Sequence, residues 1–161
     1  MRILVYMIVL LTSLLALSGC GVVEGKGEAE KVAQAMFEAR IKNGWAGSDQ
    51  YYSDLFRKRT NGKKWADVQR LVTSAMGELR SYSLNSWKVQ SGIKTNDLSG
   101  TIVVLVYQTQ YEKGKGTETV TVHKPLMGKK YVIVGHNIDS DKIRQLIDKG
   151  IRQVVSEGRT L

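Results

Sequence analysis

The chain has 161 residues, and its 24 Lys and Arg against 15 Asp and Glu give a formal charge of +9. A hydrophobic share of 42% suits one folded domain and excludes a disordered chain. A single cysteine and two histidines exclude an internal disulfide framework and any cysteine-rich zinc, haem or iron–sulfur site, so we expect no cofactor and no metal.

The N-terminal segment has the pattern of a secretory signal peptide. Arg2 is the only charged residue before Glu24, and residues 3–17 form an almost unbroken apolar run. A basic start, an apolar stretch and small residues before a cleavage site are features of exported proteins. The run has about fifteen residues, fewer than the ~20 with which a helix spans a bilayer.

The apolar run ends in Leu17-Ser18-Gly19-Cys20. This tetrapeptide resembles the lipobox of bacterial lipoproteins, in which an apolar residue and two small residues precede an invariant cysteine. The resemblance implies that residues 1–19 are removed by cleavage between Gly19 and Cys20. It also implies that the Cys20 thiol carries a diacylglycerol with acyl chains such as palmitate. An uncleaved membrane anchor with an incidental cysteine is the alternative.

The residue after the cysteine bears on the membrane that would hold the chain. Gly21 stands where an aspartate would resemble the inner-membrane retention signal of enteric bacteria. In a host with two membranes, this favours the periplasmic side of the outer membrane. We expect residues 20–27 to form the lipidated cysteine and a short Gly-rich tether, and residues 28–161 to form a single domain.

The first part of that domain is predicted to be helical. Apolar residues recur there at helical spacing, with polar residues largely opposite. Gly44 and Gly77 follow two of the periodic segments, where glycine commonly ends a helix. The predicted helices cover residues 28–42, 49–57 and 63–76.

After residue 80 the apolar pattern changes to alternation, which is typical of strands. The predicted strands cover residues 82–89, 101–111, 117–124 and 131–138. The segment 101–111 is apolar on both faces at its start, so we expect it to be central. An amphipathic helix is predicted from Ser140 or Asp141. The order predicts an α+β domain with N-terminal helices packed on a curved four-stranded antiparallel sheet, plus a C-terminal amphipathic helix.

The order of these elements resembles that of the cystatin-like and nuclear-transport-factor-two-like folds. More narrowly, residues 30–138 resemble a domain family of unknown function that occurs in exported bacterial proteins. The residues that carry this resemblance are Trp65, Gly77, Leu79, Tyr107, Tyr111, Glu118-Thr119-Val120 and Val134-Gly135. That family has no defined reaction, so the resemblance implies a fold and a location only.

His136 and Glu118 are the candidate pocket residues. By the alternation of its predicted strand, His136 shares a face with Val132, Val134 and Ile138, so it is expected to point inward. An inward imidazole acts either as a general base or as a hydrogen-bonded structural group. Glu118 lies among threonines, where it either pairs with a lysine across the hairpin or is a buried acid in a pocket.

Basic residues cluster at Arg57, Lys58, Arg59, Lys63 and Lys64. Such a cluster suits anionic lipid, an acidic polysaccharide or an envelope protein, or it is simply a solvated surface. Nucleic acid is not expected as a partner of an exported chain. The last helix covers its own fold, pairs with a second copy in a homo-oligomer, or lies on the membrane.

Motifs for catalysis are missing, since no Gly-x-Ser-x-Gly elbow and no phosphate-binding loop occur. The sequence therefore favours a membrane-anchored bacterial envelope lipoprotein that acts as a non-catalytic binding or interaction module. The alternative is a small-ligand binder or an enzyme that uses a pocket inside the curved sheet. An empty pocket would favour the alternative, and packed side chains would favour the binding module.

Overall fold

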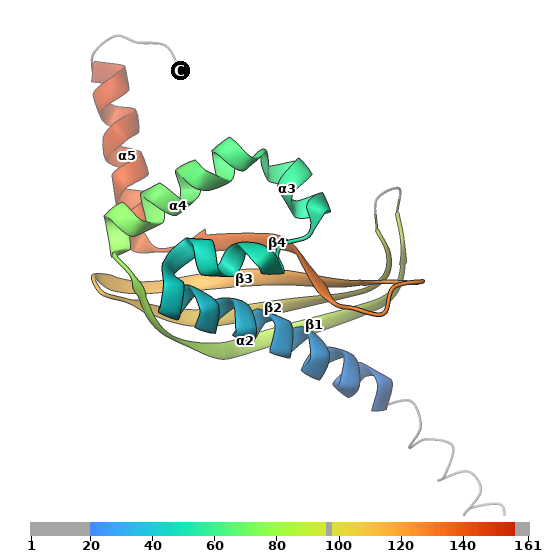
Figure 1. Cartoon of the computed structure of the whole chain (residues 1–161). Helices are drawn as coiled ribbons and strands as arrows, with labels where there is room; N and C mark the ends of the chain where they lie inside the picture. Colours follow the sequence, from blue (N-terminus) through green and yellow to red (C-terminus); the bar gives the residue numbers. More distant parts are fainter. Residues whose placement is uncertain (1–19, 96–97, 157–161) are drawn as a thin grey trace, which may run out of the picture.

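The computed structural model describes residues 20–95 and 98–156 (Figure 1). The predicted signal peptide, including Gly19, lies outside the described residues. The elements are α2 (Cys20–Ser48), the short 3-10 helix η1 (Asp49–Tyr51), α3 (Asp54–Thr60), α4 (Gly62–Met76), β1 (Leu79–Lys94), β2 (Ser99–Tyr111), β3 (Gly114–Pro125), β4 (Val132–Asp139) and α5 (Asp141–Ser156).

The four strands form one antiparallel sheet in the order β1-β2-β3-β4. Helix α2 contacts all four strands, and the sheet curves around it (Figure 1). Register shifts interrupt β1 between Leu84 and Ser86 and between Gln90 and Ile93, and such bulges bend a strand. The predicted α+β class and its four-stranded antiparallel sheet are confirmed. Strand β2 pairs with both β1 and β3, as expected for its apolar sequence.

The core lies between α2 and the sheet. Ala29, Ala33, Met36 and Phe37 are fully buried at helical spacing along one side of α2. Phe37 stacks on Tyr82 with ring centroids 4.7 Å apart and meets the ring of Tyr107 edge-on at 4.8 Å. The facing side chains of the sheet include Val103, Leu105, Val120 and Val122, all fully buried. This side of the sheet is therefore filled with packed side chains.

Helix α2 begins at Cys20, whereas its start was predicted at residue 28. Residues 20–27 are helical, which differs from the expected loose tether. Gly25 is buried, and a Cβ atom there would lie only 3.0 Å from the Tyr131 hydroxyl. Lys26 also pairs with Glu30 one turn later. Tertiary packing thus outweighs the low helix propensity of the glycines.

The predicted helix over residues 49–57 is wrong in its boundaries, because extended backbone at Tyr52 and Ser53 separates η1 from α3. Tyr52 is extended and forms a parallel bridge with Ile133 of β4. The Ser53 side chain then caps α3 by accepting a hydrogen bond from the Phe56 N–H. The extended segment between the two helices, together with the bridge to Ile133, places Tyr52 next to β4 of the sheet.

The remaining elements follow the sequence pattern. Helix α4 ends at Met76 and is followed by Gly77, whose positive φ of 75° suits glycine, and α2 kinks at Gly44 with φ 65°. Ser140 caps α5 through the Ile143 N–H. Figure 1 shows α5 extending away from the sheet beyond the end of α4. None of the described helices combines the length and apolar character needed to cross a membrane.

Candidate functional site

A buried ion pair between α2 and β3 lies at the centre of the packed interior. The Glu118 side chain is fully buried and that of Arg40 is 3% exposed. Arg40 Nη1 donates to Glu118 Oε2 at 2.8 Å, and Arg40 Nη2 donates to the Tyr111 hydroxyl at 2.6 Å. Tyr111 in turn donates to Glu118 Oε1. The guanidinium carbon of Arg40 lies 3.4 Å from the ring centroid of Trp45, which adds a cation–π contact.

His136 and Tyr52 extend this network to β4. His136 Nε2 lies 2.7 Å from Glu118 Oε2, and the Tyr52 hydroxyl lies 2.7 Å from His136 Nδ1. Burial raises the pKa of Tyr52, so its hydroxyl stays protonated at neutral pH. Because a carboxylate can only accept hydrogen bonds, His136 Nε2 donates to Glu118. We define these five residues, Arg40, Tyr52, Tyr111, Glu118 and His136, as the Glu118 network.

The charge of Glu118 is set by its surroundings. Burial alone would raise the pKa of this carboxyl group, but Arg40, His136 and Tyr111 all stabilise the carboxylate. The combined effect lowers the pKa of Glu118 from 4.5 to about 2. Glu118 is therefore an anion at neutral pH, and Arg40 balances its charge.

This lowered pKa predicts an acid-dependent loss of stability. A carboxyl group with a lower pKa when folded stabilises the protein above its unfolded pKa, and this contribution disappears as pH falls. For Glu118 the loss should run from about pH 4.5 down to about pH 2 and amount to about 3 kcal/mol. Urea unfolding across this range measures it. Glu118→Gln should remove most of this slope, whereas Glu112→Gln at the exposed pair with Arg80 should retain it.

The Glu118 network is closed. Both carboxylate oxygens, both ring nitrogens and both hydroxyl groups take part in hydrogen bonds within the network. The rings of Phe37 and Trp65 lie against the imidazole at 6.3 and 5.6 Å. A hydroxyl, an imidazole and a carboxylate in series have the connectivity of a proton relay. Here, however, the terminal hydroxyl belongs to Tyr52, which is only 5% exposed, and faces the imidazole rather than an open site.

An open groove lies beside the network, between α4, β4 and α5. Its volume is about 360 Å³, and its lining includes His136 together with Lys64 and Asn137. Trp65 lines the groove, and its indole N–H is buried in the interior without a hydrogen-bond partner among the described residues. Most of the lining is apolar, supplied by Trp65, Val68, Leu71, Val72, Ile138, Ile143 and Ile147. We call this hollow the α4–α5 groove.

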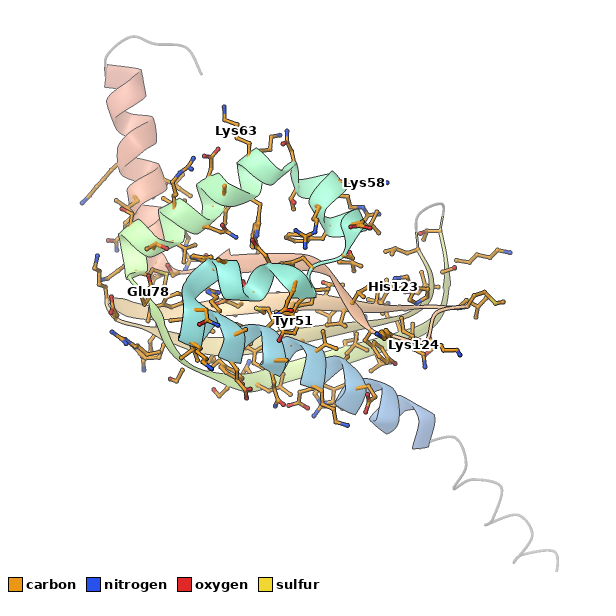
Figure 2. The ribbon with its side chains drawn as sticks, viewed as in Figure 1. Tyr51, Lys58, Lys63, Glu78, His123 and Lys124 are labelled. Carbon is orange, nitrogen blue, oxygen red and sulfur yellow. The ribbon has the colours of Figure 1, made fainter. Side chains whose placement is uncertain are left out.

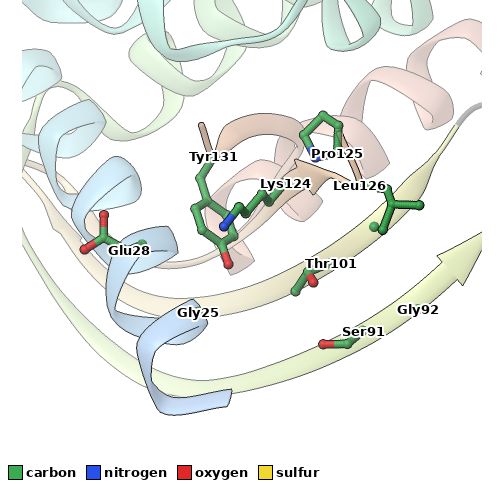
Figure 3. A pocket seen from close by; sticks show the side chains of 10 residues that line it. Gly25, Glu28, Ser91, Gly92, Thr101, Lys124, Pro125, Leu126 and Tyr131 are labelled. Carbon is green, nitrogen blue, oxygen red and sulfur yellow. The ribbon is translucent and has the colours of Figure 1, made fainter. Parts of the chain in front are cut away.

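A second hollow lies at the end of the sheet where α2 begins (Figure 3). Its volume is about 350 Å³. Gly25 and Glu28 of α2, Ser91 of β1 and Thr101 of β2 line one side of it. The segment from β3 into the following turn closes the other side through Lys124, Pro125, Leu126 and Tyr131. The hollow is more polar than the α4–α5 groove.

The predicted basic cluster is divided between two helices. Arg57, Lys58 and Arg59 lie in the last turn of α3, and Lys63 and Lys64 lie in the first turn of α4. All five side chains are exposed, and Figure 2 shows Lys58 and Lys63 directed outward. Arg57 also donates to the backbone oxygen of Asp49 at 2.6 Å. The cluster lies on the side of the molecule away from the start of α2 (Figure 1).

The structure brings the two candidate pocket residues together. His136 points inward as expected, and Glu118 is a buried acid whose charge partner is Arg40 rather than a lysine across the hairpin. Sequence reasoning did not identify Arg40, Tyr111 or Tyr52 as partners. One signal was present, because Arg40 follows Met36 and Phe37 by four and three residues and so continues the buried side of α2.

Comparison of the chain with protein-family models, with curated proteins and with solved structures gave no match. Its candidate function therefore depends on its own residues. Within residues 20–95 and 98–156, no group of three His, Cys, Asp or Glu side chains is placed to hold a metal ion.

Proposed function

We propose that this chain is a membrane-anchored bacterial envelope lipoprotein whose domain acts as a non-catalytic binding module. The tetrapeptide Leu17-Ser18-Gly19-Cys20 after an apolar run carries the first half of the proposal. Two or three acyl chains on Cys20, at about 0.8 kcal/mol per buried CH₂, would hold the protein stably on a membrane. Gly21 favours the periplasmic side of the outer membrane in a host with two membranes.

Helix α2 makes the proposed anchor a short connection. The helix begins at Cys20 and continues into the buried segment from Ala29 to Phe37. A lipid on Cys20 would thus be joined to the domain by helix rather than by a loose tether. The domain would stay close to the bilayer with its α2 end toward the lipid.

We also propose that the domain belongs among the cystatin-like or nuclear-transport-factor-two-like folds. The support is the order of elements, with helices followed by an antiparallel meander that curves around the long helix α2. Helix α5 follows as an addition after β4. Proteins with such folds have many unrelated functions, so the proposal concerns architecture alone.

The closed Glu118 network is the observation that supports a non-catalytic role. A general base must reach the proton that it removes from a substrate. Both nitrogens of His136 are occupied by Tyr52 and Glu118, and the carboxylate of Glu118 is neutralised by Arg40. These groups hold the sheet, α2 and Tyr52 together, which is a structural task.

The binding surface that the geometry favours is the α4–α5 groove. Val68 and Ile147 leave apolar surface exposed there, at 38% and 46%. Lys64 lies at the groove, and the basic cluster continues from it along α3. An envelope partner with apolar groups and negative charge fits this surface.

One observation favours the alternative of a small-ligand binder or enzyme. His136 belongs to the lining of the groove, so a bound ligand would come close to its imidazole. In that case Tyr52, whose hydroxyl lies 2.7 Å from the imidazole Nδ1, would influence ligand binding. If the domain is a non-catalytic binding module, Tyr52 has only a structural role and does not influence binding in the groove.

Binding of the apolar anion anilinonaphthalene sulfonate to the full chain tests the groove. We expect Val68→Glu to reduce dye fluorescence several-fold, because it places a negative charge in an apolar surface. Ile41→Glu on α2 is the matched control, since Ile41 is similarly exposed at 42% but does not line the groove. Equal fluorescence from both variants would contradict the groove as the binding surface. A loss on Tyr52→Phe would favour the alternative.

A further inference from the structure

The turn between β3 and β4 exposes two large apolar side chains. Leu126 is 75% exposed and Met127 is 95% exposed, the highest values among the large hydrophobic residues that the structure describes. The backbone of the turn is held in place, since the Leu126 N–H donates to Ser99 O and the Gly128 N–H donates to Pro125 O, each at 2.9 Å. The fold thus presents these side chains to the surroundings on a fixed turn.

The sequence on both sides of this turn is basic, while Glu28 of α2 lies on the opposite wall of the neighbouring hollow. Lys124 precedes the two apolar residues, and the exposed Lys129 and Lys130 follow them. No acidic residue occurs between Glu118 and Asp139. Lys124 Nζ lies 5.6 Å from the ring centroid of Tyr131, at the edge of the hollow in Figure 3. Exposed apolar side chains flanked by lysines and an aromatic residue are the residue types that bind at the interface of an anionic bilayer.

The turn lies at the same end of the molecule as Cys20. Gly25 packs against the Tyr131 hydroxyl, and Gly25 and Leu126 line the same hollow (Figure 3). Gly25 is five residues after Cys20 in α2, which is a rise of about 8 Å along the helix. A membrane that holds a lipid on Cys20 therefore also lies within reach of Leu126 and Met127.

We infer that the β3–β4 turn is a second membrane contact, in which Leu126 and Met127 enter the bilayer interface while Lys124, Lys129 and Lys130 contact anionic headgroups. This inference rests on the proposed lipid anchor. Two contacts fix the orientation of the domain, which one flexible acyl attachment would not do.

The test uses the full chain produced in a bacterium that processes lipoproteins and reconstituted into vesicles of phosphatidylcholine and phosphatidylglycerol. Met127→Cys carries an environment-sensitive fluorophore, and the lipids carry a nitroxide quencher. The matched control is Lys115→Cys, an exposed site near the first residue of β3, at the opposite end of the strand from the turn. We expect the label at residue 127 to be quenched several-fold more strongly than the label at residue 115.

Each outcome has a distinct meaning. Equal quenching at both positions overturns the inference and leaves the lipid anchor intact. A label at residue 127 that is already shielded without vesicles also overturns it, because a second copy or another part of the protein then covers the turn. If the fluorophore reacts with Cys20 of the wild-type chain, that thiol carries no lipid. This result would contradict both the proposed lipid anchor and the inference. If the label at residue 127 is quenched equally in vesicles with and without phosphatidylglycerol, the lysines do not contact anionic headgroups.

Discussion

Arg40→Ala should lower the free energy of unfolding by about 3–5 kcal/mol, because it leaves Glu118 as a buried charge without its partner. The side chain of Glu118 is fully buried, and the 2.8 Å contact to Arg40 supplies its counter-charge. The variant also loses the hydrogen bond to Tyr111 and the contact with the ring of Trp45. Since domains are stable by only about 5–15 kcal/mol, such a loss would leave the fold marginal.

Urea unfolding followed by tryptophan fluorescence measures this effect. Arg80→Ala is the control, because Arg80 pairs with Glu112 at the surface, and such pairs contribute about 0–1 kcal/mol. The double variant Arg40→Ala with Glu118→Ala should lose less stability than the sum of the two single changes. Equal stability of the Arg40 and Arg80 variants would show that the Glu118 network does not hold the domain together.

Cys20→Ala should abolish lipid attachment, because Cys20 provides the only thiol in the chain. Without that thiol no diacylglycerol can be added. The protein should then leave the membrane fraction or accumulate as an unprocessed precursor that retains residues 1–19. Labelling with a radioactive fatty acid, followed by fractionation, measures both effects. Ser18→Ala keeps a small residue at its position and should leave labelling unchanged. Undiminished labelling of the Cys20 variant would contradict the anchor.

The elements with strong periodicity were predictable. Alternation located all four strands, and helical spacing located α4 and α5. The first turns of α2 were not predictable in this way, since Gly25 and Gly27 have low helix propensity. The packing of Gly25 against Tyr131 and the pair between Lys26 and Glu30 support the helix there. The extended segment before α3 depends on the bridge between Tyr52 and Ile133. These residues are far apart in the sequence, so a local pattern does not predict their contact.

The candidate site was predictable only in part. Alternation in β4 was enough to place His136 inward. For Glu118 it left open both a surface pair and a buried acid, because the deciding partner, Arg40, lies 78 residues away in sequence. Tyr52 reaches His136 over 84 residues for the same reason. Contacts of this range depend on how the sheet curves around α2, and the sequence pattern does not specify that curvature.

The proposed lipid anchor is tested most directly by the mass of the N-terminal peptide of the protein isolated from the membrane fraction. A lipid on Cys20 requires a mature chain that begins at Cys20, with the mass of that peptide increased by a diacylglycerol group. A peptide that retains residues 1–19, or one that begins at Cys20 with a free thiol, would contradict it.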